Sequence, residues 1–581
     1  MPAALATGLA AGLAAGVLAV VPGTLVRSAD SHADSHAGSH APSVAAPAPA
    51  ASGQPNLVVV MADDMRADDL VFAPRLRRLV ADHGVSFASS FSSFPLCCPA
   101  RASFLTGQQA HNHGVLWHSA NYGYGAFDDS RTLATSLSAA GYSTAFIGKY
   151  LNRYGPARSL VGHVSSHRYV PRGWTSWQAS IDASRHTPGG TYNYFKTPFN
   201  IDGRVDLSHF GDYSTNVVGD MARKVVTRFA AKDRPFFAYI NFLAPHSGGH
   251  PESDDPPHTL VDDSGHRQEF STPARPGWVR GRFDRVITRG AGMPKGGGPS
   301  ERRVDDQPRP FRAQPEPNAR ERTALRDVTR QRAEAIYVMD REIGELIQQL
   351  KRAGEWEDTV FVFTSDNGYY LGEHRQRGGK VQPHEPSFRV PLLVTGPGLR
   401  ERRTSYDPAS VVDLSATLLD LGQASAPHPA DGRSLVPTLY GEDEGWSTPV
   451  LYESIHSGGR PRGGDPFTSV GVRTARFMYV DRADGKHMLF DLARDPLQNR
   501  NLARSQGYRD EIRALRDVLR DLRDCAGVGC QVPLPEVLAV DAAEAARLGR
   551  HYWRVLTRTY GFHAARGSRG VISGPGPGVR R

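Results

Sequence analysis

Continuous apolar runs that alternate with helix-length segments constrain the fold of this chain more than any other feature. The first run, residues 56–61, reads Asn-Leu-Val-Val-Val-Met, and similar runs lie at 143–147, 235–242, 359–364 and 390–394. Such runs are typical of strands that are buried on both faces of a sheet. Helix-length stretches lie at 73–83, 132–140, 215–230, 322–352 and 411–421. This alternation predicts a doubly wound α/β sheet.

Two stretches depart from this pattern. Residues 251–317 are rich in Pro, Gly and Arg with little periodicity, so we expect either a mobile linker or a loop system on the substrate side. After residue 441, short apolar segments at 469–474, 477–480 and 487–491 predict a small antiparallel sheet, and a helix follows at 506–524. We therefore expect a signal-like segment and flexible linker at 1–52, a large α/β domain at 53–440, an antiparallel-sheet subdomain at 441–535 and a basic tail at 536–581.

The charge of the chain is positive and almost entirely due to arginine. The 581 residues carry a formal net charge of +9, and only 8 of the 69 Lys and Arg residues are lysines. Positive charge favours anionic partners, nucleic acid and sulfated sugars alike, but a codon bias towards arginine is an equally good explanation. A lysine at a candidate site is therefore informative, because lysine is rare in this chain.

The N-terminus and one cysteine pair are typical of an exported protein. Residues 3–21 contain no charge and precede Ala-, Ser- and His-rich repeats, which predicts a signal peptide followed by a flexible linker, with a retained anchor as the alternative. Cys525 and Cys530 enclose a short loop with two glycines, which favours a disulfide in an oxidising compartment. The adjacent Cys97 and Cys98 cannot bridge comfortably, and zinc-finger spacing is absent.

Polar residues follow four of the predicted strands. In an open α/β sheet, ligands bind just beyond the carboxyl ends of the strands, so we expect these residues to meet at one edge. They are Asp63, Asp64, Lys149, His246, Asp366 and Asn367. Side chains that offer only oxygen suit a hard cation rather than zinc. We predict a metal site with Ca²⁺ as the first candidate and Mg²⁺ as the alternative, built from Asp63, Asp64, Asp366 and Asn367.

The segment 95–107 adds a cysteine to this set. Pro99 stands where a helix would begin and Gly107 where it would end, so Cys97 lies at a helix N-terminus, where free backbone amides favour an anion. The pattern Cys97-x-Pro99-x-Arg101 followed by Leu-Thr-Gly resembles the signature of the sulfatase family. The resemblance spans roughly residues 56–501, and the Asp-Asp, Lys, His, Asp-Asn and second Lys elements of that family recur in the same order.

The resemblance implies an alkaline-phosphatase-like α/β sandwich with a large, mostly parallel central sheet, plus a small C-terminal subdomain with an antiparallel sheet and a helix. It implies that a formylglycine-generating enzyme oxidises Cys97 to 3-oxoalanine (Cα-formylglycine), whose hydrate binds the metal and attacks sulfur. Arg101 and Lys149 would hold the modified side chain. His246 and Lys380 would face the sulfate and the leaving oxygen.

Two further residues, Asn152 and His374, are expected to bind substrate. Many relatives have Gly-Lys-Trp-His where this chain has Gly148-Lys-Tyr-Leu-Asn152, so Asn152 is expected to do part of that histidine's work. This motif, together with Tyr192-Asn-Tyr194, is similar to the subgroup of N-acetylglucosamine-6-sulfatases and extracellular heparan endosulfatases. The implied reaction is hydrolysis of a sulfate monoester on a sugar such as 6-sulfated N-acetylglucosamine, with exo and endo action both open.

Two alternative functions belong to other classes. A phosphomonoester, phosphodiester or phosphonate hydrolase of the same superfamily would act on esters of similar shape and charge, and a non-catalytic secreted protein could bind polyanions through its arginines. The expected partners are a sulfated saccharide and the formylglycine-generating enzyme, without nucleic acid, and with a membrane only if the N-terminal segment is retained. The expected location is secreted or at the cell surface.

Overall fold

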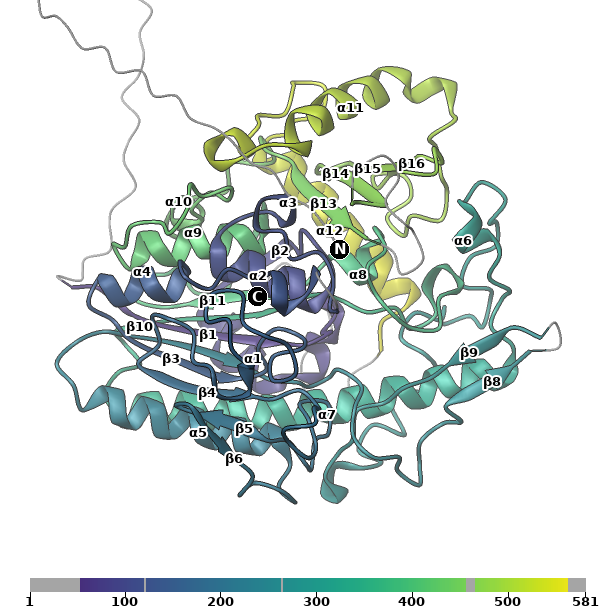
Figure 1. Ribbon diagram of the computed structural model, residues 1–581. Coiled ribbons are helices and arrows are strands. Elements are labelled where there is room, and N and C mark those ends of the chain that lie inside the picture. Colours follow the sequence, from purple (N-terminus) through teal and green to yellow (C-terminus); the bar gives the residue numbers. More distant parts are fainter. Residues whose placement is uncertain (1–52, 120–121, 263–264, 456–465, 563–581) are drawn as a thin grey trace, which may run out of the picture. The chain divides into compact units, whose positions relative to one another are not determined.

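A ten-stranded mixed sheet forms the centre of the protein in the computed structural model (Figure 1), which describes residues 53–119, 122–262, 265–455 and 466–562. The strand order is β12-β2-β11-β10-β1-β7-β3-β4-β5-β6. In chain order these strands are β1 (Asn56–Ala62), β2 (Gly84–Phe91), β3 (Ser143–Gly148), β4 (Ser176–Ser180), β5 (Phe199–Ile201), β6 (Arg204–Asp206), β7 (Phe236–Asn241), β10 (Thr359–Ser365), β11 (Leu392–Thr395) and β12 (Arg403–Ser410).

Helices cover both faces of this sheet. Successive residues of β1 belong to two apolar clusters: Val58 and Val60 pack with α5 and α7, whereas Leu57 and Val59 pack with α2, α4 and α9. Figure 1 shows α5 and α7 on one face and α4 and α9 on the other. This is the predicted α/β sandwich. The helices involved are α1 (Pro74–Leu79), α2 (Cys97–Thr106), α4 (Leu133–Ala139), α5 (Ser214–Ala230), α7 (Ala319–Arg352) and α9 (Val411–Leu421).

The register of the parallel strands sets up the binding edge. Strands β10, β1, β7, β3 and β4 lie side by side and run parallel. β1 and β10 pair from Asn56 with Thr359 to Ala62 with Ser365, so the residues that follow both strands leave the sheet at the same level. The prediction that these strand ends converge is confirmed.

The sheet is mostly parallel, as expected, and its outer strands include antiparallel pairs. Strand β11 runs antiparallel to β10 and to β2, and β2, β12 and β4–β6 were not predicted. β2 contains three serines, and β12 contains Asp407 and Pro408 with a register shift between Ser405 and Pro408. These polar or interrupted segments lack the apolar run that identifies a strand in the sequence. The predicted helix at 73–83 is also shorter, because α1 ends at Leu79.

A separate four-stranded antiparallel sheet follows, as predicted, with one additional strand. Its order is β13-β14-β15-β16, and apolar residues of α11, such as Leu515 and Leu519, pack with Val470 and Val472 of β14. The strands and the following helix are β13 (Val450–Ser454), β14 (Ser469–Arg473), β15 (Phe477–Arg482), β16 (Met488–Asp491) and α11 (Arg509–Arg523).

The segment expected as a basic tail contains a well-packed helix, α12 (Ala542–Thr559). Its residues Leu548, Trp553 and Leu556 are buried in one apolar cluster with Phe91 of β2, because the helix carries its apolar side chains on one face. Residues 563–581 and the predicted signal-like segment and linker at 1–52 lie outside the described residues. The domain boundaries remain predictions.

The segment 251–317 is largely irregular but is packed against the main body. It contains β8 (Thr259–Val261), β9 (Arg267–Glu269) and α6 (Arg309–Arg312), and Val279 and Ile287 are buried in the cluster that includes α7. The interpretation as a mobile linker is therefore wrong. Three further short α-helices among the described residues are α3 (Ala110–His113), α8 (Glu385–Phe388) and α10 (Val436–Tyr440).

The cysteines behave as the sequence predicts. Cys525 and Cys530 form a disulfide, and Cys97 and Cys98 are free and buried. Among the described residues, no helix is long and apolar enough to cross a membrane.

Candidate active site

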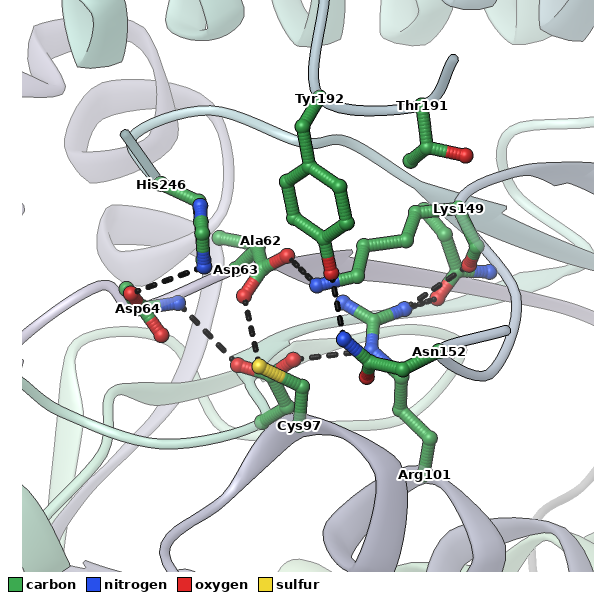
Figure 2. A network of polar contacts seen from close by, with 12 residues as sticks. Ala62, Asp63, Asp64, Cys97, Arg101, Lys149, Asn152, Thr191, Tyr192 and His246 are labelled. Carbon is green, nitrogen blue, oxygen red and sulfur yellow. Dashed lines mark hydrogen bonds and ion pairs between the residues drawn. The ribbon is translucent and has the colours of Figure 1, made fainter. Parts of the chain in front are cut away.

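The ends of four neighbouring strands bring the predicted polar residues together (Figure 2). Cys97, the first residue of α2, joins them: its Sγ lies 3.4 Å from Asp63 Oδ1 and 2.8 Å from Lys380 Nζ. The carboxyl oxygens of Asp63 and Asp64, Cys97 Sγ and a ring nitrogen of His246 all lie within 4.8 Å of one another. The structure thus confirms that these side chains form one cluster.

Asp366 and Asn367 adjoin this cluster through Asp64. The backbone N–H of Asp64 donates to Asp366 Oδ1 at 3.1 Å, and Asn367 Nδ2 donates to Asp64 Oδ1 at 2.6 Å. Asn367 Oδ1 is buried and has no hydrogen-bond partner among the described residues. Buried carboxylates with an unpartnered amide oxygen form a donor set that fits a hard divalent cation.

Positive side chains balance the carboxylates. Lys149 Nζ pairs with Asp63, Lys380 Nζ pairs with Asp64, and Arg101 Nε donates to Asp366 Oδ2 at 2.8 Å. Burial alone would raise the pKa of Asp64, but Lys380 and His246 hold it below its ordinary value. Three carboxylates thus face three fixed cations, so the cluster carries no large net charge before a ligand binds.

The Cys97 thiol is a poor nucleophile in this setting. Burial, reinforced by the Asp63 carboxylate, raises the pKa of Cys97 to about 12, although the two lysines oppose this rise. The side chain is therefore a neutral thiol near pH 7, and thiolate chemistry requires the ionised form. An unmodified Cys97 does not suit this site as an attacking group.

Arg101 lies one turn along α2 from Cys97 and ties three strand ends together. Besides its bond to Asp366, its Nη1 donates to Asn241 Oδ1 at 2.8 Å and to the Lys149 carbonyl at 3.0 Å. Its side chain is buried. These bonds fix the end of β7, the start of the loop after β3 and the end of β10 relative to α2.

His246 enters the cluster as a neutral imidazole. Burial is the main cause that lowers its pKa to about 3, and Lys380 and Lys149 lower it further against the pull of Asp64. His246 Nδ1 lies 2.6 Å from the Ser247 carbonyl, which can only accept. The ring proton therefore sits on Nδ1. Nε2 carries the lone pair and lies 3.6 Å from Asp64 Oδ2.

Tyr192 also belongs to the cluster, although it was not predicted as a site residue. Its ring centroid lies 4.9 Å from Lys149 Nζ and 4.9 Å from the His246 ring, and its hydroxyl accepts a 2.6 Å hydrogen bond from Asn152 Nδ2. Figure 2 shows this hydroxyl pointing into the cluster. The only signal in the sequence is the Tyr192-Asn-Tyr194 motif that contributes to the family resemblance.

His118 is a second residue that the sequence analysis missed. Burial, together with Lys380, Lys149 and His246, lowers its pKa to about 4, so it lies in the electrostatic field of the cluster. Its ring packs 4.6 Å from that of Trp117. No motif in the sequence marks this position.

His374 lies apart from these contacts, against the expectation that it binds substrate. Its Nδ1 lies 3.1 Å from Glu301 Oε2, and its ring stacks on His384 at 3.8 Å. The side chain is buried, and its φ of 50° belongs to a tight turn after β10 that directs the ring to Glu301. We therefore leave His374 out of the candidate site.

Comparison with known proteins identifies relatives of this chain. A sequence model of the sulfatase family matches residues 55–424, and a model described as N-sulphoglucosamine sulphohydrolase, C-terminal, matches residues 372–525. The chain is 30% identical over 422 residues to the N-acetylglucosamine-6-sulfatase of Capra hircus, covering 70% of this chain and 67% of that protein. It is 29% identical over 426 residues to the extracellular sulfatase SULF-1 homolog of Drosophila melanogaster.

These alignments do not extend over the whole of every relative. The match covers 70% of this chain but only 33% of the Drosophila protein, and 69% of this chain but 61% of the arylsulfatase of Volvox carteri. The chain therefore spans about a third of the first relative's length and about three fifths of the second's.

Solved structures share the fold. One, in complex with its substrate D-glucosamine-2-N,6-O-disulfate, has a TM-score of 0.59 at 21% identity and covers 81% of this chain and 98% of that chain. The phosphonate monoester hydrolase of Agrobacterium radiobacter has a TM-score of 0.55 at 23% identity, covering 84% and 99%. The fold alone does not separate these chemistries, but the sequence match over residues 55–424 does identify the family. The chain belongs to the sulfatase family.

Proposed function

We propose that this protein hydrolyses sulfate monoesters on a sugar, with a 6-O-sulfated glucosamine unit as the best candidate substrate. The observation that carries the proposal is the position of Cys97 at the N-terminus of α2, among three carboxylates and two lysines. Two relatives support the sugar: the similar Capra hircus protein is named N-acetylglucosamine-6-sulfatase, and a structural neighbour holds D-glucosamine-2-N,6-O-disulfate.

Members of this family use a formylglycine side chain and a divalent metal. We propose that Cys97 carries the formylglycine and that the metal is Ca²⁺, held by Asp63, Asp64, Asp366 and Asn367 with the modified Cys97. When present, the formylglycine hydrate supplies a nucleophilic hydroxyl and the cation supplies Lewis-acid polarisation of the sulfate. The raised pKa of the Cys97 thiol supports the need for conversion.

The fixed cations of the chain are proposed to hold the sulfate. A sulfate monoester repels nucleophiles through its own negative charge, so positive groups around its oxygens lower the barrier to attack. Lys149 and Lys380 supply ammonium groups whose pKa values are raised, chiefly by Asp63 and Asp64 against the effect of burial, so both remain charged at neutral pH. Arg101 keeps Asp366 and the Lys149 backbone in position.

Proton transfer is assigned to His246 and Lys380. The lone pair of His246 Nε2 faces the cluster, so this atom can accept a proton from an attacking hydroxyl. Lys380 Nζ, 2.8 Å from Cys97 Sγ, carries protons that it can donate to a leaving alcohol oxygen. Asn152 is proposed to contact the substrate, because its Oδ1 is buried without a partner among the described residues.

A panel of substrates tests the proposal. The purified protein is expected to release sulfate from glucosamine 6-sulfate, measured by ion chromatography, and Cys97→Ala should abolish release. A mass spectrum of the peptide that contains Cys97 should show loss of H₂S and gain of oxygen relative to the thiol. An active enzyme whose Cys97 is wholly unmodified contradicts the mechanism.

A phosphonate or phosphodiester substrate is the second candidate, because a phosphonate monoester hydrolase shares the fold. Hydrolysis of phosphodiesters without activity on any sulfated glucosamine would favour it. We also propose that the protein acts outside the cell or at its surface, since some relatives are named extracellular sulfatases.

A further inference from the structure

Helix α11 (Arg509–Arg523) carries a row of arginines along one side. Successive residues of a helix turn by about 100°, so positions 509, 513, 516 and 520 fall within about 60° of arc. Arg504, in the segment that leads into the helix, adds a fifth guanidinium beside them. We call these residues the arginine stripe: Arg504, Arg509, Arg513, Arg516 and Arg520.

The stripe is exposed and only weakly neutralised. All of its members are exposed, with side-chain exposures of 73% for Arg513 and 71% for Arg520. These two pair with Asp510 and Asp517 on the same helix. Exposed ion pairs of this kind contribute little to stability, so a bound anion can replace the aspartate as the partner of the arginine. In the part of the chain that the structure describes, Arg504 and Arg509 have no carboxylate within 4.0 Å.

One member of the stripe is fixed in place. Arg516 Nε donates to the Tyr479 hydroxyl of β15 at 2.9 Å. This bond is to a neutral group, so it orients the guanidinium without cancelling its charge. The stripe thus combines one arginine that is held in place with Arg504 and Arg509, which have no carboxylate within 4.0 Å among the described residues.

The stripe lines a groove of about 500 Å³. The groove lies between the 503–506 segment and α11, and its other lining residues include Ser505, Gln506 and Ile512, with Asp517 as its one carboxylate. All five arginines of the stripe line it. Such a lining suits an anionic ligand that can also form hydrogen bonds.

The opposite face of α11 packs against the part of the protein that holds the candidate active site. Leu515 and Leu519 are buried in one apolar cluster with Leu96 and Val381. Leu96 and Val381 are the chain neighbours of Cys97 and Lys380. The groove and the cluster at Cys97 therefore belong to the same packed unit.

We propose that the arginine stripe binds a sulfated polysaccharide, so that a polymer substrate is held at a second place on the same packed unit as the Cys97 site. Guanidinium groups bind oxyanions through two parallel hydrogen bonds, which suits sulfate. Stripe positions three or four residues apart are separated by about 4.5–6 Å of helix rise, so the stripe spreads its guanidinium groups along the helix and suits a chain of repeated anionic groups rather than one sulfate. The inference rests on the sugar-sulfatase activity proposed above.

The test removes charge from the stripe and from matched positions elsewhere. The stripe variant is Arg504→Gln, Arg509→Gln, Arg513→Gln and Arg520→Gln; it keeps Arg516 because of its bond to Tyr479. The control variant changes four exposed arginines that lie on separate parts of the chain, and thus removes the same net charge: Arg78→Gln, Arg285→Gln, Arg320→Gln and Arg554→Gln. Binding of fluorescent heparin is measured by anisotropy, and hydrolysis of glucosamine 6-sulfate is measured separately.

The stripe variant is expected to bind heparin at least tenfold more weakly than the parent, with a shallower dependence on salt. The control variant should lose less than threefold, and both should hydrolyse the monosaccharide like the parent. Equal losses in the two variants would overturn the proposal, because heparin would then respond to net charge alone. Equally tight and equally stripe-dependent binding of a DNA duplex would overturn the sulfated-sugar assignment. If no sulfated sugar is hydrolysed, the proposed function fails while the heparin result still decides the groove.

Discussion

Replacement of Tyr192 by Phe tests whether the hydroxyl that points into the cluster contributes to turnover. Asn152 Nδ2 donates to this hydroxyl at 2.6 Å, so the phenol proton is free to be donated to another group. Burial is the main cause that raises the pKa of Tyr192, with Asp182, Cys97 and Asp63 adding to it. The phenol therefore stays protonated and serves as a neutral donor within the field of Cys97.

The magnitude follows from what the substitution removes. Tyr192→Phe deletes one acceptor for Asn152 and one donor to the cluster, and a lost hydrogen bond with an unsatisfied partner costs about 1–3 kcal/mol. If about 1.4 kcal/mol of this is lost from the transition state, kcat falls about tenfold. Tyr192→Leu also removes the ring beside Lys149, so a further loss of about 0.5–2 kcal/mol is expected.

The assay is steady-state sulfate release from glucosamine 6-sulfate, with kcat and KM determined separately and folding checked by thermal denaturation. The matched control is Tyr142→Phe, which removes a hydroxyl that donates to the Pro55 carbonyl. Tyr142 and Pro55 directly precede β3 and β1, so this bond lies at the opposite ends of the strands from the candidate site. The control should share any small loss of stability but keep the parent kcat. A Tyr192→Phe enzyme with the kcat, KM and pH profile of the parent would refute the reasoning.

Three further outcomes are expected. Asp366→Asn should abolish sulfate release and lower the bound divalent metal measured by mass spectrometry, whereas stoichiometric zinc without calcium or magnesium in the parent would contradict the metal assignment. Glu385→Gln should cost about 3–5 kcal/mol in chemical denaturation, because it leaves the buried Arg473 uncompensated. Glu453 accepts from His111 at 2.6 Å and helps raise the pKa of His111 to about 9 although burial opposes this. About 1–2 kcal/mol of stability is therefore present below pH 6.5 and lost as pH rises through 9, and denaturation curves of His111→Gln should lack this loss.

The residues that follow the central strands could be predicted because their signals are local. A short, nearly continuous apolar run such as β1 favours a buried strand, and the residue after such a strand emerges at the carboxyl edge of the sheet. Asp63, Lys149 and Asp366 were found in this way. Cys97 was found from helix-boundary residues and from the family resemblance.

The rest depends on tertiary contacts that the sequence does not display. Strand β12 is held by parallel pairing with β2, although its own sequence contains a proline and an aspartate. Tyr192 reaches the cluster from a loop, where no periodicity indicates the direction of a side chain. His374 does not directly follow a strand end, and its ring contacts Glu301 instead of the cluster.

The burial of the cluster changes what a loss-of-charge substitution means in this protein. From the sequence, a residue after a strand end is expected to face solvent and to contribute little to folding. In the structure Asp366 is fully buried, and its carboxylate is 2.8 Å from Arg101, which is itself buried. Asp366→Ala therefore removes a metal ligand and also leaves a buried guanidinium without its partner, a cost of about 3–5 kcal/mol. Loss of activity in Asp366→Ala alone cannot assign a catalytic role, whereas Asp366→Asn keeps the side-chain volume and one oxygen for Arg101.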